Sequence, residues 1–311
     1  MPDADANRSR LLYRTETTFG EALPTNPAMS ALRFTADTIK PSIAAVVSNE
    51  IRSDMMRSQQ LQTGYNIGGG FAFEFSDGTY DPFMEALLHS TFTSSVLKNG
   101  TAAQKYFQME RGMMDVTQFL VFRDMTPNTM NLVIPSRGIV TGDFGFMGVT
   151  PGVASGTSML GTGTLTPITT SPIMSAGAGV QNVNVNGASI GVGVREIRLS
   201  INASLREREV VDDLASRDFG RGAFDIGGSI RMYFSTVALY NYFIANTSFA
   251  LAFTISDLVS KKYTFLMPNC QLSDSNEPVS AIDTDIEQTV NFKAFADTGI
   301  SAAISITKAS F

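Results

Sequence analysis

Ile67-Gly-Gly-Gly-Phe-Ala-Phe-Glu-Phe-Ser76 is the stretch that decides the fold, because the chain contains it twice. A second version, Ile226-Gly-Gly-Ser-Ile-Arg-Met-Tyr-Phe-Ser235, aligns with it without a gap and has the same residue at five of the ten positions. After the glycines, bulky apolar residues alternate with small or polar ones. This alternation predicts a β-strand with one buried and one solvated face.

The repeat extends beyond these two strands. At the same offset, Glu50 aligns with Glu209, Asp54 with Asp213, Phe83 with Tyr242, Met84 with Phe243 and Ala86 with Ala245. With a gap, Asn131-Leu-Val-Ile-Pro135 also resembles Thr264-Phe-Leu-Met-Pro268. Matches that occur in the same order indicate a duplicated architecture. We therefore interpret residues 1–149 as a first module with an N-terminal arm and residues 188–311 as a second module.

Most of the remaining sequence also predicts strands. Short runs rich in Val, Ile, Phe and Thr are separated by Gly, Pro, Asn or Asp. The clearest runs are 43–47, 71–75, 118–122, 131–134, 196–201, 230–234 and 289–295. Helical spacing predicts one short helix in each module, at 81–88 and 237–245. The predicted fold class is therefore mainly β, with sandwich or barrel modules that each carry one short helix.

Three segments differ from this strand-rich pattern. Residues 150–187 lie in a stretch without charge and are dominated by Gly, Ser, Thr, Ala and Pro, which is typical of a linker or a long surface loop. Each module also contains a polar excursion, at 50–65 and 207–225, that is longer than a hairpin turn. We expect both excursions to be docking loops that are mobile in the free subunit.

Composition excludes several classes of protein. The 311 residues are 43% hydrophobic, which suffices for a substantial core, and the net charge of −6 disfavours tight binding to nucleic-acid phosphates. The single cysteine permits no intrachain disulfide, and no apolar run has the length of a transmembrane helix or the form of a signal peptide. We expect a protein that folds in a reducing cytoplasm and contacts no membrane.

No combination of residues predicts catalysis, a cofactor or a metal. The single histidine, His89, excludes a multi-histidine metal site and is expected at the surface or at a helix end. Cys270 has no histidine nearby in sequence and is expected to be an inert thiol. Gly156 and Gly161 have P-loop spacing, but Thr162 stands where that loop needs a lysine. We expect no catalytic, cofactor-binding or metal-binding residues and no enzymatic activity.

Segments of both modules resemble the major tail tube proteins of siphophages, the long-tailed bacteriophages. In the first module these are Ser48-Asn-Glu-Ile-Arg-Ser-Asp54, the glycine-led strand and Tyr80-Asp-Pro-Phe-Met-Glu-Ala-Leu-Leu88. In the second they are Glu209-Val-Val-Asp-Asp213, the second glycine-led strand and Asp283-Thr-Asp-Ile-Glu-Gln-Thr-Val-Asn-Phe-Lys-Ala-Phe-Ala-Asp297. The resemblance covers about residues 15–300.

The resemblance implies a structural virion protein without a cofactor. In that family, subunits form rings, their inner strands join into one continuous β-barrel around a lumen, and a long loop docks onto the neighbouring ring. The stacked rings conduct DNA from capsid to host. The implied partners are further copies of the chain, the tape measure, tail terminator and distal tail proteins, and double-stranded DNA in passage. The implied location is the virion tail, after assembly in the host cytoplasm.

The resemblance also assigns candidate residues. The solvated faces of the predicted strands supply the lumen-facing candidates Ala72, Glu74, Glu196, Arg198, Ser200, Asn202, Ser229, Arg231 and Tyr233. The polar excursions supply the inter-ring docking candidates Glu50, Arg52, Asp54, Arg57, Glu209, Asp212, Asp213 and Arg217. Acidic and basic residues are mixed on the solvated faces, so we expect a weakly acidic bore. Relatives with one module per chain form sixfold rings, which implies a trimer with pseudo-sixfold symmetry here.

Two other classes remain open. An outer-membrane porin would suit the alternating strands and the acidic composition, but the absence of Trp and the presence of only eight Tyr make its aromatic girdles hard to build. A carbohydrate-binding β-sandwich would also be expected to use Trp as a stacking platform.

Overall fold

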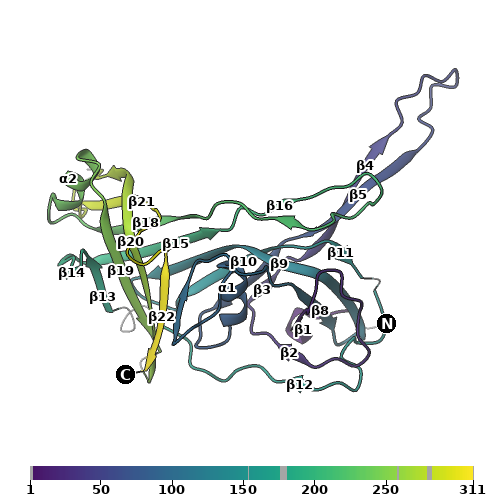
Figure 1. The fold of residues 1–311 in the computed structure, drawn as a ribbon, viewed down its shortest axis with the longest axis horizontal. Helices are drawn as coiled ribbons and strands as arrows, with labels where there is room; N and C mark the ends of the chain where they lie inside the picture. The colour runs from purple at the N-terminus through teal and green to yellow at the C-terminus, as the bar shows by residue number, and fades with distance from the viewer. Residues whose placement is uncertain (1–2, 153, 176–180, 258, 279–281, 311) are drawn as a thin grey trace.

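The computed structural model describes residues 3–152, 154–175, 181–257, 259–278 and 282–310. These residues are mainly β, as the sequence predicts, and include two short α-helices, one in each half of the chain. The molecule is elongated, with the two termini toward opposite ends, and a long hairpin projects from the end that carries the N-terminus (Figure 1).

The outer layer of the first module is an antiparallel sheet in the order β2, β1, β8, β9. A 3₁₀ turn, η1, precedes it. The elements are η1 (Ala6–Arg8), β1 (Ser9–Thr15), β2 (Met29–Ala31), β8 (Phe107–Met113) and β9 (Gln118–Pro135). Only the first half of β9 belongs to this layer, because its second half enters the inner layer.

The inner layer of the first module runs in the order β3, β6, β10, β9. Its further strands are β3 (Ala36–Asp37), β6 (Gly70–Glu74) and β10 (Thr141–Met147). The predicted alternation is confirmed, because Phe71, Phe73 and Phe75 are buried whereas Ala72 and Glu74 are half-buried. The buried phenylalanines contact one another and α1 (Asp81–Leu87), with the Phe71 and Phe83 rings 5.3 Å apart.

The second module repeats this plan. Its elements are β13 (Gln181–Val185), β14 (Ala188–Ser189), β15 (Val194–Asn202), β18 (Asp225–Tyr233), α2 (Ala238–Ile244), β19 (Phe249–Ser256), β20 (Lys261–Asn276) and β21 (Glu287–Ala294). The outer order is β14, β13, β19, β20, and the inner order is β15, β18, β21, β20. The long β20 therefore connects the two layers as β9 does.

Strand irregularities occur at the same places in both modules. The β8–β9 pair shifts register between Phe107 and Met109, and the β19–β20 pair shifts between Phe249 and Leu251. Bulges are local features with specific geometry, so their recurrence supports the duplication independently of residue identity.

One of the sequence matches is wrong. Asn131 lies in the inner half of β9 and pairs with Asp143, whereas Thr264 lies in the outer half of β20 and pairs with Thr254. The two apolar runs are in equivalent strands but at different positions along them. An apolar run predicts that a strand is buried, but it does not predict which residues of the partner strand it pairs with.

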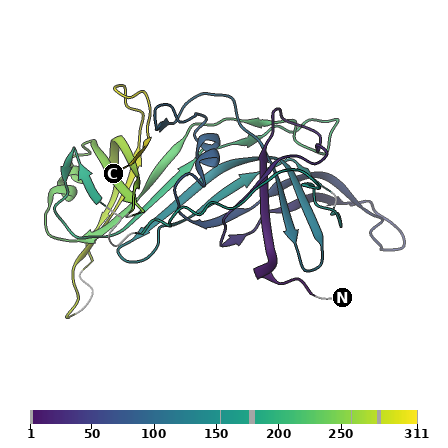
Figure 2. The same cartoon turned by 90° about the horizontal axis from the view of Figure 1, so that it is seen from below.

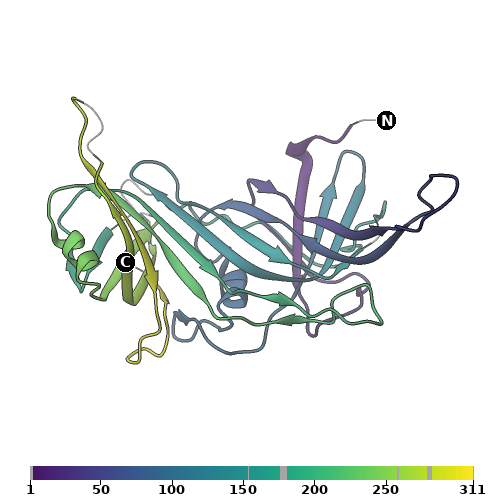
Figure 3. The same cartoon turned by 90° about the horizontal axis from the view of Figure 1, so that it is seen from above.

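The two modules share one sheet. β15 pairs with the second half of β9, so the inner layers join into a run of seven strands in the order β6, β10, β9, β15, β18, β21, β20. Figures 2 and 3 show these strands sweeping across the length of the molecule. The run has open ends, so no barrel is closed within one chain.

The uncharged segment runs along the surface from the first module toward the second. It contributes β11 (Thr150–Pro151), which pairs with β9, and β12 (Leu165–Thr166), which lies parallel to β2. Residues 153 and 176–180 of this segment lie outside the described residues. Because β13 pairs with β19 as β1 pairs with β8, we propose that the second module begins at Gln181 rather than at 188.

His89 lies at the end of a helix, which is one of the two expected positions, but it is buried and not at the surface. It directly follows α1, is 3% exposed, and its ring lies 5.5 Å from that of Phe224 in the second module. Burial and the charge of Arg221 lower the pKa of His89 to about 4. The imidazole is therefore a neutral filler between the modules at physiological pH.

A buried carboxyl in the first module predicts a pH dependence of stability. Glu16 is 7% exposed, and its Oε1 accepts a 3.0 Å hydrogen bond from the Asp124 N–H. Burial raises the pKa of Glu16 to about 7. The hydrogen bond from the Asp124 N–H opposes this rise, and the negative charge of Asp124 adds to it. The protonated form fits the fold better, so this stability is present below about pH 4.5 and is lost as the pH rises through 7.

Glu16→Gln keeps the acceptor and removes the charge. We expect the variant to be more stable than the parent by about 1–2 kcal/mol at pH 8 and of similar stability at pH 5, as measured by urea unfolding. An equal difference at both pH values would show that the carboxyl does not titrate as described.

Candidate inner face and projecting arm

All nine predicted lumen-facing residues lie on one face of the seven-strand run. We call this side, opposite the buried apolar side chains, the inner face. Register pairs connect Glu74 on β6 with Asp274 on β20 through Thr141, Val133, Arg198, Ser229 and Asn291. The structure therefore brings together residues from both modules that are far apart in sequence.

The cations on the inner face are held by carboxylates. Glu287 on β21 pairs with both Arg195 and Arg231, Glu196 pairs with Arg198, and Lys293 Nζ lies 3.1 Å from Asp225 Oδ1. Partial desolvation of Glu287 opposes ionisation, but hydrogen bonds from the two arginines hold the pKa of this carboxyl below its ordinary value. The Glu287 and Lys293 pairs cross between strands, and the Glu196–Arg198 pair lies along β15, so the guanidinium groups are not free to bind a passing phosphate.

Carboxylates exceed cations on this face. In β6, β10, β15, β18, β21 and the inner-layer halves of β9 and β20, the charged residues are Glu74, Asp143, Glu196, Asp225, Asp274 and Glu287 against Arg195, Arg198, Arg231 and Lys293. Asp143 accepts a 2.9 Å hydrogen bond from Asn131, and Asp274 accepts one of 3.4 Å from Asn291. The face is therefore mixed in sign with a small acidic excess.

Sequence reasoning missed half of this face. It named residues on β6, β15 and β18 but none on β9, β10, β20 or β21, so Asp143, Asp274, Glu287 and Lys293 were absent. Alternating burial along β21 marks the solvated side with Glu287, Thr289, Asn291 and Lys293. The signal was present in the sequence as a period of two, and only the cross-strand partners required the structure.

The first polar excursion is part of a projecting hairpin, which we call the arm. It consists of β4 (Lys40–Val47), the tip 48–59 and β5 (Gln60–Gly68), paired with each other in a two-stranded sheet (Figure 1). The predicted loop over 50–65 is thus wrong in its second part, because 60–65 are strand. Its cross-strand hydrogen bonds satisfy the backbone of a segment that has few tertiary contacts.

The tip of the arm exposes apolar side chains, and charged side chains of the tip form ion pairs with one another. Ile51, Met55 and Met56 are 102%, 96% and 69% exposed. Arg52 is bonded within the tip to Asp54 at 2.8 Å and to Glu50 at 3.3 Å. The docking candidates chosen for their charge are therefore largely paired among themselves, and the unsatisfied surface is apolar.

The second excursion is closed at its base and contacts the arm, and its mobility in the free subunit stays a prediction. β16 (Arg206–Glu207) and β17 (Phe219–Gly220) close its base, and Arg208 pairs with Asp218 at 2.9 Å. The Leu214 carbonyl accepts a 3.0 Å hydrogen bond from the Tyr65 N–H of the arm.

The hydrogen bond between Tyr65 and Leu214 places the second group of docking candidates at the base of the arm. Glu209, Asp212, Asp213 and Arg217 lie in the loop that the Leu214 contact holds against the first module. Val211 on the same loop is fully exposed.

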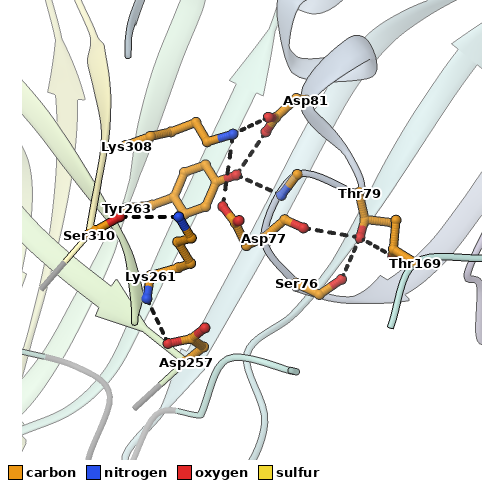
Figure 4. Close-up of polar contacts among 11 residues, drawn as sticks. Ser76, Asp77, Thr79, Asp81, Thr169, Asp257, Lys261, Tyr263, Lys308 and Ser310 are labelled. Atoms are coloured by element: carbon orange, nitrogen blue, oxygen red, sulfur yellow. Dashed lines mark hydrogen bonds and ion pairs between the residues drawn. The ribbon is translucent and has the colours of Figure 1, made fainter. Parts of the chain in front are cut away.

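A polar cluster fastens the modules together (Figure 4). The C-terminal strand β22 (Ser305–Ser310) pairs with β20 and with β7 (Val96–Lys98) of the first module. Lys308 on β22 binds Asp81 and lies 3.8 Å from Asp77, both in the first module. The buried Tyr263 donates a 2.8 Å hydrogen bond to Asp81 and accepts one of 3.0 Å from the Gly78 N–H.

Tyr263→Phe should destabilise the fold by about 1–3 kcal/mol, because it removes both hydrogen bonds and leaves a buried N–H without its acceptor. Urea unfolding measures the change. Tyr233→Phe is the matched control: its ring is 39% exposed on the inner face, so the expected change is within about 0.5 kcal/mol. Equal effects of the two substitutions would contradict a fastening role for Tyr263.

The described residues offer no metal site, since no group of three or more His, Cys, Asp or Glu side chains is arranged around a common point. Cys270 is buried, and burial raises the pKa of its thiol to about 12. Within the same described residues, no helix has the length and apolar character needed to cross a bilayer.

Comparison with protein families shows which family the chain matches. A family model described as phage tail tube protein matches residues 6–294, which include the arm, the inner face, the first module and the second module as far as β21. Comparison with curated proteins gives no match.

Proposed function

The chain belongs to the phage tail tube protein family, and from this membership we propose that its copies polymerise as stacked rings into the tube that conducts DNA from the capsid to the host. As a family member it is a structural component of the virion tail. We further propose that assembly takes place in the host cytoplasm and that the tail is of the siphophage type.

The inner face carries the proposal. Its seven antiparallel strands present polar side chains to solvent over both modules, and each of its four cations is paired with a carboxylate. A wall of this kind attracts phosphates weakly, since binding to DNA is driven by free Lys and Arg that replace counterions. The small acidic excess adds a weak repulsion. DNA would therefore slide along such a wall instead of adhering to it.

Three chains per ring fit the duplication. The described parts of the two modules have the same strand order, two bulges at equivalent positions and one α-helix each, so a ring of three chains presents six similar modules. The modules differ in detail, and the symmetry would be threefold with an approximate sixfold repeat. An open sheet run is closed by further copies of the chain, which removes the unpaired strand edges.

The arm suits contact between rings. It projects from the module, and its tip presents three exposed apolar side chains and internally paired charges. The end rings of the tube would meet other tail proteins, of which the tape measure, tail terminator and distal tail proteins are the proposed partners.

Electron microscopy of the purified protein tests the proposal. We expect rings or tubes whose cryo-electron microscopy reconstruction contains three chains per ring, with the inner face toward the bore. Rings of six chains would overturn the stoichiometry, and a bore lined by free lysines and arginines would overturn the sliding wall. A protein that stays monomeric at every concentration, or that is stable only in detergent, would overturn the tube itself.

A further inference from the structure

The two modules of one chain meet at a strand junction, and the repeat makes it possible to identify the equivalent strands at the open edges of the chain. β15 extends the inner sheet of the first module by pairing with the second half of β9, from Glu196 opposite Pro135 to Asn202 opposite Thr129. In the repeat, β4 corresponds to β15 and β20 corresponds to β9. The internal junction therefore has an external counterpart made of β4 and β20.

The first correspondence follows from strand register. Lys40 on β4 pairs with Gly68, and Ser200 on β15 pairs with Gly227. Gly68 and Gly227 occupy the same position in the repeated Ile-Gly-Gly motif. Lys40 is thus the structural equivalent of Ser200.

The second correspondence follows from the bulges. Met125 pairs with Phe107 and Cys270 pairs with Phe249, each next to the bulge of the outer layer. Four residues further along, Thr129 on β9 and Asp274 on β20 each lie next to a second bulge in the inner layer. Thr129 and Asp274 are therefore equivalent.

Both counterpart strands have an open edge. β4 pairs only with β5, and the second half of β20 pairs only with β21, among the residues that the structure describes. Residues 40–46 of β4 are exposed, including Ile43 at 64% and Val46 at 57%. Within the chain, the equivalent edges of β15 and β9 cover each other.

We propose that β4 of one chain pairs in antiparallel fashion with the second half of β20 of a neighbouring copy, in the register that β15 adopts with β9. Lys40 then lies opposite Asn276, and Ser42 lies opposite Asp274. The inference rests on the proposed ring, and it specifies the two edges that meet and their register. Three such junctions alternate with the three internal ones around the ring.

Charge complementarity supports this register. Among the residues that the structure describes, Lys40 has no ion pair and Asp274 has no cation partner. In the proposed register Lys40 is the diagonal neighbour of Asp274 on the same face, a separation that a lysine side chain can span. The junction would thus pair a further cation with a carboxylate, as on the rest of the inner face.

A cysteine pair tests the register. Within the chain, the Ala203 N–H donates a 2.8 Å hydrogen bond to the Asn128 carbonyl, so the adjacent pair Asn202 and Thr129 is not hydrogen-bonded and its Cβ atoms are close. The equivalent pair between chains is Ser42 and Asp274. We therefore expect Ser42→Cys/Asp274→Cys to give covalent trimers after mild oxidation, seen on denaturing gels without reductant.

Two variants serve as controls. Thr129→Cys/Asn202→Cys should give the corresponding disulfide within the chain and no covalent oligomer. Ser42→Cys/Asn276→Cys is displaced by two residues and should give at least 10-fold less cross-linked product. The native Cys270 is buried and does not compete.

The outcomes separate the two proposals. Rings visible by electron microscopy without the Ser42–Asp274 cross-link, or with a preferred cross-link to position 276, would overturn the register and leave the tail tube function intact. Covalent oligomers that extend beyond trimers would support the strand pairing and overturn three chains per ring. An absence of rings in the parent protein would overturn the proposed function and the junction with it.

Discussion

Replacing Ile51, Met55 and Met56 together by serine is expected to stop tube elongation and leave the fold of the subunit unchanged. These side chains are at least 69% exposed in the free chain, so little folding free energy depends on them. Burying each against a neighbouring ring would contribute about 1.5–3 kcal/mol. Losing all three should weaken each docking event by at least about 100-fold.

Tube length and yield in electron micrographs measure the loss, and circular dichroism with urea unfolding checks the fold. The matched control is Glu50→Gln/Arg52→Gln/Asp54→Asn, which neutralises an exposed ion-pair group on the same tip. Such pairs contribute little, so elongation should fall by less than about threefold. If the control stops elongation and the serine variant does not, docking is electrostatic and the apolar tip is not its basis.

The sequence was sufficient to predict the alternating strands and the duplication. Period-two alternation in the glycine-led strands placed Phe71 and Phe73 inside and Glu74 outside, because each residue of a strand faces opposite to its neighbours. Both short helices were also predicted, to within one residue at each end. These features depend on local spacing and need no knowledge of the partner strands.

Partners across the sheet could not be predicted in the same way. Glu287 holds Arg195 and Arg231, which are distant in sequence, and only the order β15, β18, β21 brings them together. The exposed apolar tip of the arm could not be predicted for a related reason. Apolar residues such as Ile51 resemble core residues in a sequence, and only the position of the arm reveals that no described part of the chain covers them.

The sequence alone also does not distinguish the roles of the glycines in the first repeated motif. One of them, Gly70, is the position where substitution is expected to have the second large effect on stability. Gly68, Gly69 and Gly70 look alike in the sequence, but a Cβ on Gly70 would lie 1.8 Å from the Phe144 carbonyl oxygen on the paired strand. No rotamer relieves this clash, because both atoms belong to the backbone or are fixed to it. Gly70→Ala should therefore separate β6 from β10 and destabilise the fold by about 3 kcal/mol.

Gly68→Ala is the matched control within the same motif. A Cβ there meets nothing within 4 Å, and the residue is not in the left-handed region. Because alanine reduces the conformational freedom of the unfolded chain, we expect no loss of stability and a gain of up to about 1 kcal/mol. Urea unfolding of the two variants compares them directly. Since β6 is the first strand of the seven-strand run, Gly70→Ala should also abolish rings, whereas Gly68→Ala should assemble normally. Equal stability of the two variants would contradict the close approach of β6 and β10 at Gly70.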